Sequence, residues 1–192
     1  MKKVLLLLCV LSILSFSLWL ARQLADSGAT LETASQAFLR GDYADALRAY
    51  ESLAAVPGQS QTEGRQGLLR CLLMSGQYER VATLATTYLK ESPESPDWHF
   101  FLGRAFVLRG KHAEAKSAFG KAAQARSPVA IDAQLQLALL LKSLGDFTQS
   151  RELFSTVYER ANAAGDRLDL AAQALHHLER YKESNRLFKQ VT

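Results

Sequence analysis

One short pattern recurs five times along this chain and constrains its fold more than any other feature. Its first copy reads RGDYADALRAY, at residues 40–50, and the later copies follow in phase. Each copy contains one turn position, and successive turn positions lie 35, 34, 35 and 34 residues apart. The turn positions are Gly41, Gly76, Gly110, Gly145 and Glu179. A period this regular is typical of stacked supersecondary units, each too small to bury its own apolar face.

Residues at fixed distances from each turn predict a helical hairpin. The position two residues later holds Tyr43, Tyr78, His112, Phe147 and Tyr181, and the position five residues later holds Ala46, Val81, Ala115, Ser150 and Ser184. Glycine adopts the left-handed conformation that a reversal needs at least cost. We expect the ring to pack back across the turn and the small residue to let two antiparallel helices approach. Gly103, in a preceding helix, predicts close contact with a neighbouring helix.

The pattern therefore predicts ten helices in five antiparallel pairs. The expected helices cover residues 29–40 and 43–55, 61–75 and 78–91, 96–109 and 112–125, 128–143 and 147–163, and 167–178 and 181–190. The corresponding units are 27–60, 61–94, 95–127, 128–163 and 164–192, after an N-terminal segment, 1–26. Ser95 is expected to cap a helix whose first residue is Pro96, and Ser127-Pro128 to begin the next unit in the same way.

The period of about 34 residues and the motif W-H-F-F-L-G-x-x-F, at 98–106, resemble the tetratricopeptide repeat, as does G-K-H-x-x-A-x-x-x-F, at 110–119. The resemblance covers about residues 27–192 and is strongest in the third unit. The second unit departs from it at Val81 and Ala85, and the fifth departs at Glu179. The resemblance implies an all-α, right-handed superhelical solenoid. Its concave face would be lined by the first helix of each pair and would bind extended or helical peptide segments.

The family's inner-face positions map onto a candidate partner-binding groove in this chain. Its residues are Gln66, Arg70, Phe100, Arg104, Leu135, Leu139 and Lys142, flanked by acidic positions such as Asp97, Asp132 and Asp169. An apolar trough with cationic anchors suits a peptide that carries acidic and hydrophobic groups. The alternative interpretation is a solvated helix face with internal pairs such as Asp97 with Arg104. Leu31 and Ser35 stand where the carboxylate-binding subtype has Lys and Asn, so that subtype is not expected.

The N-terminal segment begins with Lys2 and Lys3, followed by eighteen uncharged residues, 4–21. As a helix this run would be about 27 Å long, enough for the hydrocarbon core of a bilayer. The lysines would stay on the cytoplasmic side, and the rest of the chain would be exported. An uncleaved anchor and a signal removed near residues 25–29 are both open.

No catalytic, metal or cofactor motif is found in the sequence. His176 and His177, near Glu179 and Glu183, are the only cluster of candidate ligands. They point about 100° apart on a helix and are expected to be solvated imidazoles. The net charge of +4 includes no basic stripe with interleaved aromatics, so a nucleic-acid partner is not expected.

The sequence thus predicts a non-enzymatic protein-interaction scaffold in a cell envelope. It would be anchored in the inner membrane or exported to the periplasm, and would support assembly of an envelope complex. Two alternatives remain: an accessory region of an envelope protease or transferase, and a self-associating anchor. The second rests on Leu187, Phe188 and Val191, which we expect to be partly uncovered at the C-terminal end.

Overall fold

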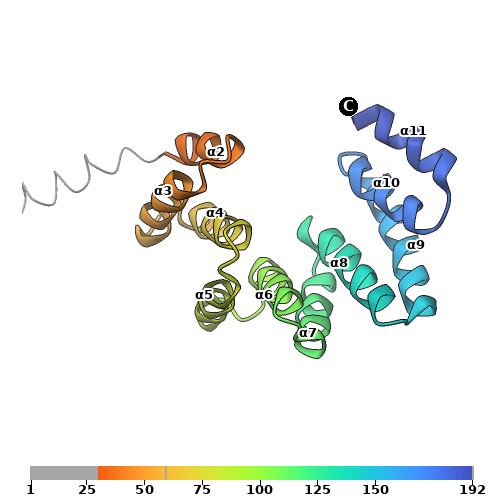
Figure 1. The fold of residues 1–192 in the computed structure, drawn as a ribbon, viewed down its shortest axis with the longest axis horizontal. Helices are drawn as coiled ribbons and strands as arrows, with labels where there is room; N and C mark the ends of the chain where they lie inside the picture. Colours follow the sequence, from red (N-terminus) through yellow and green to blue (C-terminus); the bar gives the residue numbers. More distant parts are fainter. Residues whose placement is uncertain (1–29, 59, 192) are drawn as a thin grey trace, which may run out of the picture. The chain divides into compact units, whose positions relative to one another are not determined.

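A computed structural model describes residues 30–58 and 60–191 of the chain, and this part contains ten helices and no strand (Figure 1). The predicted anchor or signal, 1–26, lies outside the described residues. Among the helices that the structure describes, none combines the length and the apolar character needed to cross a membrane.

The helices fall into two compact units, divided between Ser75 and Gly76. The first unit contains α2 (Leu31–Leu39), α3 (Tyr43–Ala55) and α4 (Gln61–Met74). The second contains α5 (Tyr78–Glu91), α6 (Pro96–Leu108), α7 (His112–Ala123), α8 (Val129–Ser143), α9 (Phe147–Ala164), α10 (Leu168–His177) and α11 (Tyr181–Val191). The predicted all-helical pattern is confirmed, with every helix end within two residues of its predicted place.

Within the second unit, each helix packs on the next along the chain, from α5 to α11. In addition, α6 contacts α8, and α8 contacts α10. These three helices are the first members of successive pairs, so they lie side by side. The aromatic positions Phe119 and Phe154 fill the space between helices and are 0% and 1% exposed. In the first unit, α2 packs on both α3 and α4, and α3 packs on α4.

The turn positions adopt the left-handed conformation that the repeat predicts. Four of them are glycines with φ between 72° and 84°. The fifth is Glu179, at φ 64°, and it is the only non-glycine residue with positive φ in the described part of the chain. An L-residue in this region costs roughly 1–2 kcal/mol. The last hairpin therefore has the same turn conformation as the others, although its turn position holds Glu179 and not glycine.

The small position after each turn lies at the contact between paired helices. In the pairs that lie within one unit, Ala46 and Ala115 are fully buried there. In the fourth pair Ser150 donates a buried hydrogen bond of 2.9 Å to the carbonyl oxygen of Ala138. In the fifth, Ser184 donates one of 2.8 Å to that of Ala172. The two serines thus bond the second helix directly to the backbone of the first.

The predicted packing of the ring across the turn is seen in two pairs. Tyr43 lies against Phe38 with ring centroids 5.5 Å apart, and Tyr181 lies against His176 at 5.3 Å. Phe147 differs, because it is 66% exposed. The residue at the matching place before its turn is Lys142, which offers no ring to pack against.

The two predicted helix starts have different outcomes. Ser95 occupies the N-cap of α6 with Pro96 in the first turn, as predicted, although its side chain makes no capping hydrogen bond. The prediction for Ser127 is wrong. Pro128 itself takes the N-cap of α8, in helical geometry, so the Ser127 hydroxyl cannot cap the helix.

Gly103 makes the close helix contact that the sequence predicts. A Cβ atom at this position would lie 2.6 Å from Cδ1 of the buried Phe119 ring, a distance at which the ring must shift. Gly67 plays the same part in the first unit, where a Cβ would collide with the ring of Tyr50.

We predict that Gly103→Ala lowers the free energy of unfolding by about 1–3 kcal/mol, because the added methyl group overpacks the contact with Phe119. Urea denaturation of both variants measures the effect. Gly120→Ala in α7 is the matched control, since a Cβ there meets nothing within 4 Å. Its greater helix propensity should raise stability by up to about 1 kcal/mol. Equal effects of the two substitutions would contradict this account.

We predict that Glu179→Gly stabilises the protein by up to about 1 kcal/mol. Relief of the left-handed strain outweighs the larger backbone entropy that glycine gives the unfolded chain. Gly145→Ala, at φ 84°, should destabilise it by about 1 kcal/mol for the same reason. Thermal unfolding of the two variants must show changes of opposite sign.

Candidate functional site

The candidate groove residues divide between the two units. Gln66 and Arg70 lie on α4 of the first unit, where Gln66 is half-buried and Arg70 exposed. The other five lie in the second unit: Phe100 and Arg104 on α6, and Leu135, Leu139 and Lys142 on α8. Because α6 and α8 contact each other, we take the exposed sides of these two helices together as the candidate site and call it the first-helix face.

The α6 part of the face combines a fixed aromatic ring with a guanidinium. Phe100 is half-buried, with its ring centroid 5.7 Å from that of Phe101 and 6.1 Å from that of Phe119. These contacts hold the ring in place while part of it stays accessible. Arg104, one helical turn further on, is also half-buried.

The α8 part of the face is less apolar than the sequence predicts. Leu135 is 2% exposed and belongs to a core cluster with Phe154 and Val157. Its side chain fills the interior between α8, α9 and α10 and does not line the surface. Leu139 is half-buried against the same cluster, and Lys142 is exposed at the end of the helix.

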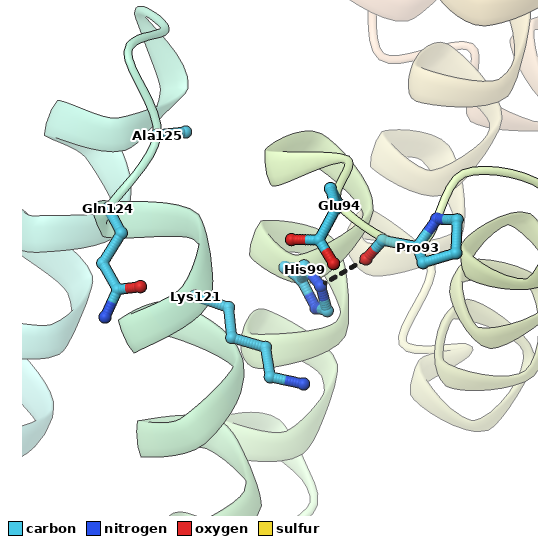
Figure 2. Close-up of a pocket in the computed structure, with 6 residues that line it drawn as sticks. All are labelled: Pro93, Glu94, His99, Lys121, Gln124 and Ala125. Carbon is cyan, nitrogen blue, oxygen red and sulfur yellow. Dashed lines mark hydrogen bonds between the residues drawn. The ribbon is translucent and has the colours of Figure 1, made fainter.

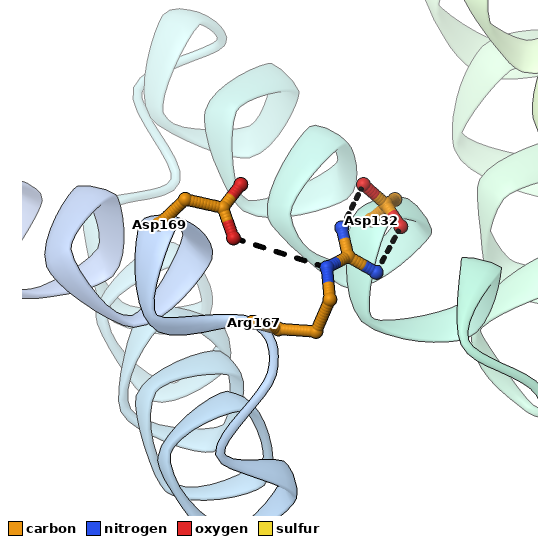
Figure 3. A network of polar contacts seen from close by, with 3 residues as sticks. All are labelled: Asp132, Arg167 and Asp169. Carbon is orange, nitrogen blue, oxygen red and sulfur yellow. Dashed lines mark hydrogen bonds and ion pairs between the residues drawn. The ribbon is translucent and has the colours of Figure 1, made fainter. Parts of the chain in front are cut away.

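An ion-paired network joins α8 to the start of α10 (Figure 3). Arg167 donates two hydrogen bonds to the Asp132 carboxylate, at 3.0 and 2.8 Å, and its Nε lies 3.8 Å from Asp169. The hydrogen bonds from Arg167 to Asp132 raise the pKa of the guanidinium. The sequence analysis named both aspartates as flanking positions but missed Arg167, which is the N-cap residue of α10 and has no counterpart among the motif positions of the repeat. The Asp132 carboxylate is therefore engaged within the chain.

The two adjacent histidines differ in their surroundings. His176 is exposed, as predicted, but His177 is half-buried and stacks on the ring of Phe154, with centroids 4.7 Å apart and planes at 21°. The prediction of two solvated imidazoles is thus wrong for His177. Burial lowers its pKa, and the positive charges of Lys142 and His176 add to the effect. The described residues contain no group of His, Cys, Asp and Glu side chains suited to a metal ion.

A polar cleft of about 500 Å³ opens where the α5–α6 turn meets α7 (Figure 2). Its lining residues are Pro93, Glu94, His99, Lys121, Gln124 and Ala125. His99 is 9% exposed, and its Nε2 lies 2.9 Å from the carbonyl oxygen of Pro93. This hydrogen bond ties the turn to α6. Burial lowers the pKa of His99, and nearby Lys121 acts in the same direction, while the bond to Pro93 and the Glu94 charge oppose them.

Cys71 on α4 has no exposed surface, and burial raises the pKa of its thiol to about 11. Such a thiol is almost entirely protonated at neutral pH, and the thiolate is the reactive form. Cys71 is therefore a packing residue in the first unit.

Comparisons with known proteins support the tetratricopeptide-repeat assignment. A family model described as the tetratricopeptide repeat matches residues 72–131. A crystal structure of the MamA protein is 17% identical, with a TM-score of 0.53 over 83% of this chain and 86% of that one. A putative kinesin light chain from Podosopora anserina, with nearly identical TPR-like repeats, is 18% identical, with a TM-score of 0.56 over 84% and 90%. These likenesses establish a TPR-like fold. No curated protein matches the sequence.

We predict that the stability of the protein falls as the pH drops from about 7 to 5, in part because of His99. Its pKa is lowered from 6.5 in the folded state. Between the folded-state pKa and 6.5 the unfolded chain binds more protons than the folded protein, so acidification favours unfolding. The contribution is fully present above pH 6.5 and is lost as the pH falls to the folded pKa.

His99→Gln removes the titration and keeps a side-chain donor for the Pro93 carbonyl. Urea midpoints measured across this pH range should then fall less steeply than in the parent protein, with the remaining slope due partly to His177. His112→Gln, at an exposed position on α7, is the control. An unchanged slope in His99→Gln would contradict the assignment.

Proposed function

We propose that this protein is a non-enzymatic interaction scaffold that binds a peptide segment of a partner protein on the first-helix face of its second unit. The observation that supports the proposal is the lateral contact of α6 with α8, the two helices that carry Phe100, Arg104, Leu139 and Lys142. Stacked helix pairs present continuous surfaces of this kind to extended ligands.

The chemistry of the face favours a segment with both apolar and acidic groups. Phe100 and Leu139 are half-buried, so each is held by the core while part of it can contact a ligand. Fixed aromatic anchors bind at low entropic cost. Arg104 and Lys142 add positive charge near them, which suits carboxylates of the partner. The Asp132 carboxylate is not available to neutralise this positive charge, because it accepts two hydrogen bonds from Arg167.

We further propose that residues 1–26 tether the protein to a membrane or direct its export, so that the repeat region works in the cell envelope and supports assembly of a complex there. The support is the order of the sequence, with Lys2 and Lys3 before eighteen uncharged residues. Protease digestion of intact and permeabilised cells tests this, because an exported repeat region is cleaved once the outer barrier alone is opened.

Self-association is a second candidate function, favoured by one observation on α11. Phe188 and Val191 are 39% and 50% exposed on this helix, while Leu187 packs against the core. Sedimentation velocity over a range of concentrations distinguishes a self-associating chain from a monomeric binder.

We predict that a photocrosslinker placed at Phe100 captures a partner in cells, and that Arg104→Glu reduces the yield by roughly tenfold or more, since charge reversal within an interface repels an acidic ligand. Mass spectrometry of the crosslinked product identifies the partner. Arg126→Glu is the matched charge reversal, at an exposed position after α7. Equal capture by the two variants would exclude the first-helix face as the binding site.

A further inference from the structure

Exposed apolar side chains gather at the turns inside the helix pairs. Of the nine large apolar side chains exposed in the described residues, six lie within two residues of a turn position. These six are Leu39, Met74, Leu108, Leu144, Phe147 and Tyr181, and they are 46–80% exposed. These positions recur with the period of the repeat, and the side chains lie outside the buried core. Leu144 and Phe147 lie at the same turn, and neighbouring exposed apolar groups of this kind are candidates for a contact surface.

A small cleft lies beside one of these turns, between α8 and α9. Its volume is about 80 Å³, and its walls come from three helices. The lining residues are Lys142 from α8; Phe147, Ser150, Arg151 and Phe154 from α9; and His177 and Glu179 from the end of α10 and its turn. At roughly 30 Å³ per water molecule, this space holds two or three waters, or one carboxylate group.

Two cations line this cleft without partners. Neither Lys142 nor Arg151 forms a hydrogen bond or an ion pair within the described residues, and both side chains are exposed. Arginines at other turns are paired instead: Arg109 with Glu79, and Arg180 with Glu183.

The imidazole of His177, which stacks on Phe154, also lines the cleft. Glu179 is the only carboxylate among the lining residues. The cleft therefore carries a surplus of positive charge.

We propose that this cleft binds a side-chain carboxylate of a partner peptide segment, whose neighbouring apolar residue rests on Phe147 and Leu144. The inference rests on the proposed function and names the chemistry that the partner must carry. Charge complementarity favours the carboxylate, and the exposed apolar groups beside the cleft favour a segment that continues past it. A polyanion would need a longer row of cations than the two that line this cleft.

Three side chains of the cleft would bind the carboxylate. Arg151 offers a planar pair of donors and Lys142 a point charge, and both form charge-assisted hydrogen bonds with a carboxylate. His177 adds a further donor when it is protonated. The groups that face it are Lys142 from α8, Arg151 from α9, and His176 and Glu179 from α10 and its turn. A bound carboxylate offsets the repulsion from the cations, so it raises the His177 pKa, and affinity increases as the pH falls.

The test uses the full-length chain and two probe peptides, acetyl-Leu-Asp-Phe-amide and acetyl-Leu-Asn-Phe-amide, followed by NMR of the histidine rings. The aspartate peptide should shift the His177 resonances and raise its pKa, and the asparagine peptide should bind roughly tenfold more weakly. Lys142→Gln and Arg151→Gln should each weaken binding by about threefold to tenfold. Lys116→Gln, an exposed cation on α7, should leave binding unchanged.

Three outcomes would overturn the proposal: equal binding of the two peptides, no shift of His177 at millimolar peptide, or His177 shifts produced only by vesicles of anionic phospholipid. These outcomes are separable from failure of the proposed function. Lys142 belongs to both surfaces, so Arg151→Gln separates them: if Arg104→Glu abolishes partner capture while Arg151→Gln leaves it intact, the first-helix face binds the partner and the cleft does not. If neither set of variants affects capture, both are wrong.

Discussion

The close approach of the two helices of a pair, where both belong to one compact unit, is the contact on which the rest of this structure depends. It requires a residue without bulk at one place in the second helix, and the chain supplies Ala, Val or Ser there in every copy of the pattern. All five of these residues are at most 2% exposed. Where the residue is Ser, its hydroxyl bonds to a backbone carbonyl of the first helix. The contact thus fixes both the separation of the helices and their register.

The first-helix face follows from that register. Since each pair presents its first helix to the next pair, α6 meets α8 and α8 meets α10. The ion pair between Arg167 and Asp132 joins the start of α10 to α8. Both partners are less than a third exposed, so solvent screens the pair less than it screens a fully exposed one. A ligand on this face would meet a surface whose spacing is set by the core beneath it.

The sequence predicts the helices well because their signals are local and repeated. A turn residue, a small residue and an aromatic residue recur in fixed order, and the bounds of each helix follow from them. Gly103 is predictable for the same reason, because glycine inside a helix needs a packing explanation. Glu179 stands out as a departure in the sequence, and the structure shows that it takes the same backbone conformation as the glycines.

The candidate site is harder to predict because its properties depend on which surfaces become buried. Leu135 occupies an inner-face position by alignment, yet the neighbouring helices cover it. His177 belongs to a polar doublet, but its ring stacks on Phe154 from another helix. The aligned places in earlier copies hold Leu39, Met74, Leu108 and Ser143, which are all exposed, so the repeat gave no signal of this burial. Lys142 and Arg151 lie on different helices, so only the folded chain brings them to one cleft.

The buried thiol of Cys71 on α4 is a built-in reporter of how often the first unit opens. Cys71 has no exposed surface and is held in its unreactive form, so an alkylating reagent reaches it only after α4 separates from its neighbours. The rate of its modification, followed on the peptide that contains it, therefore measures how often this unit opens. Partner binding that steadies the unit would slow the reaction without any engineered label.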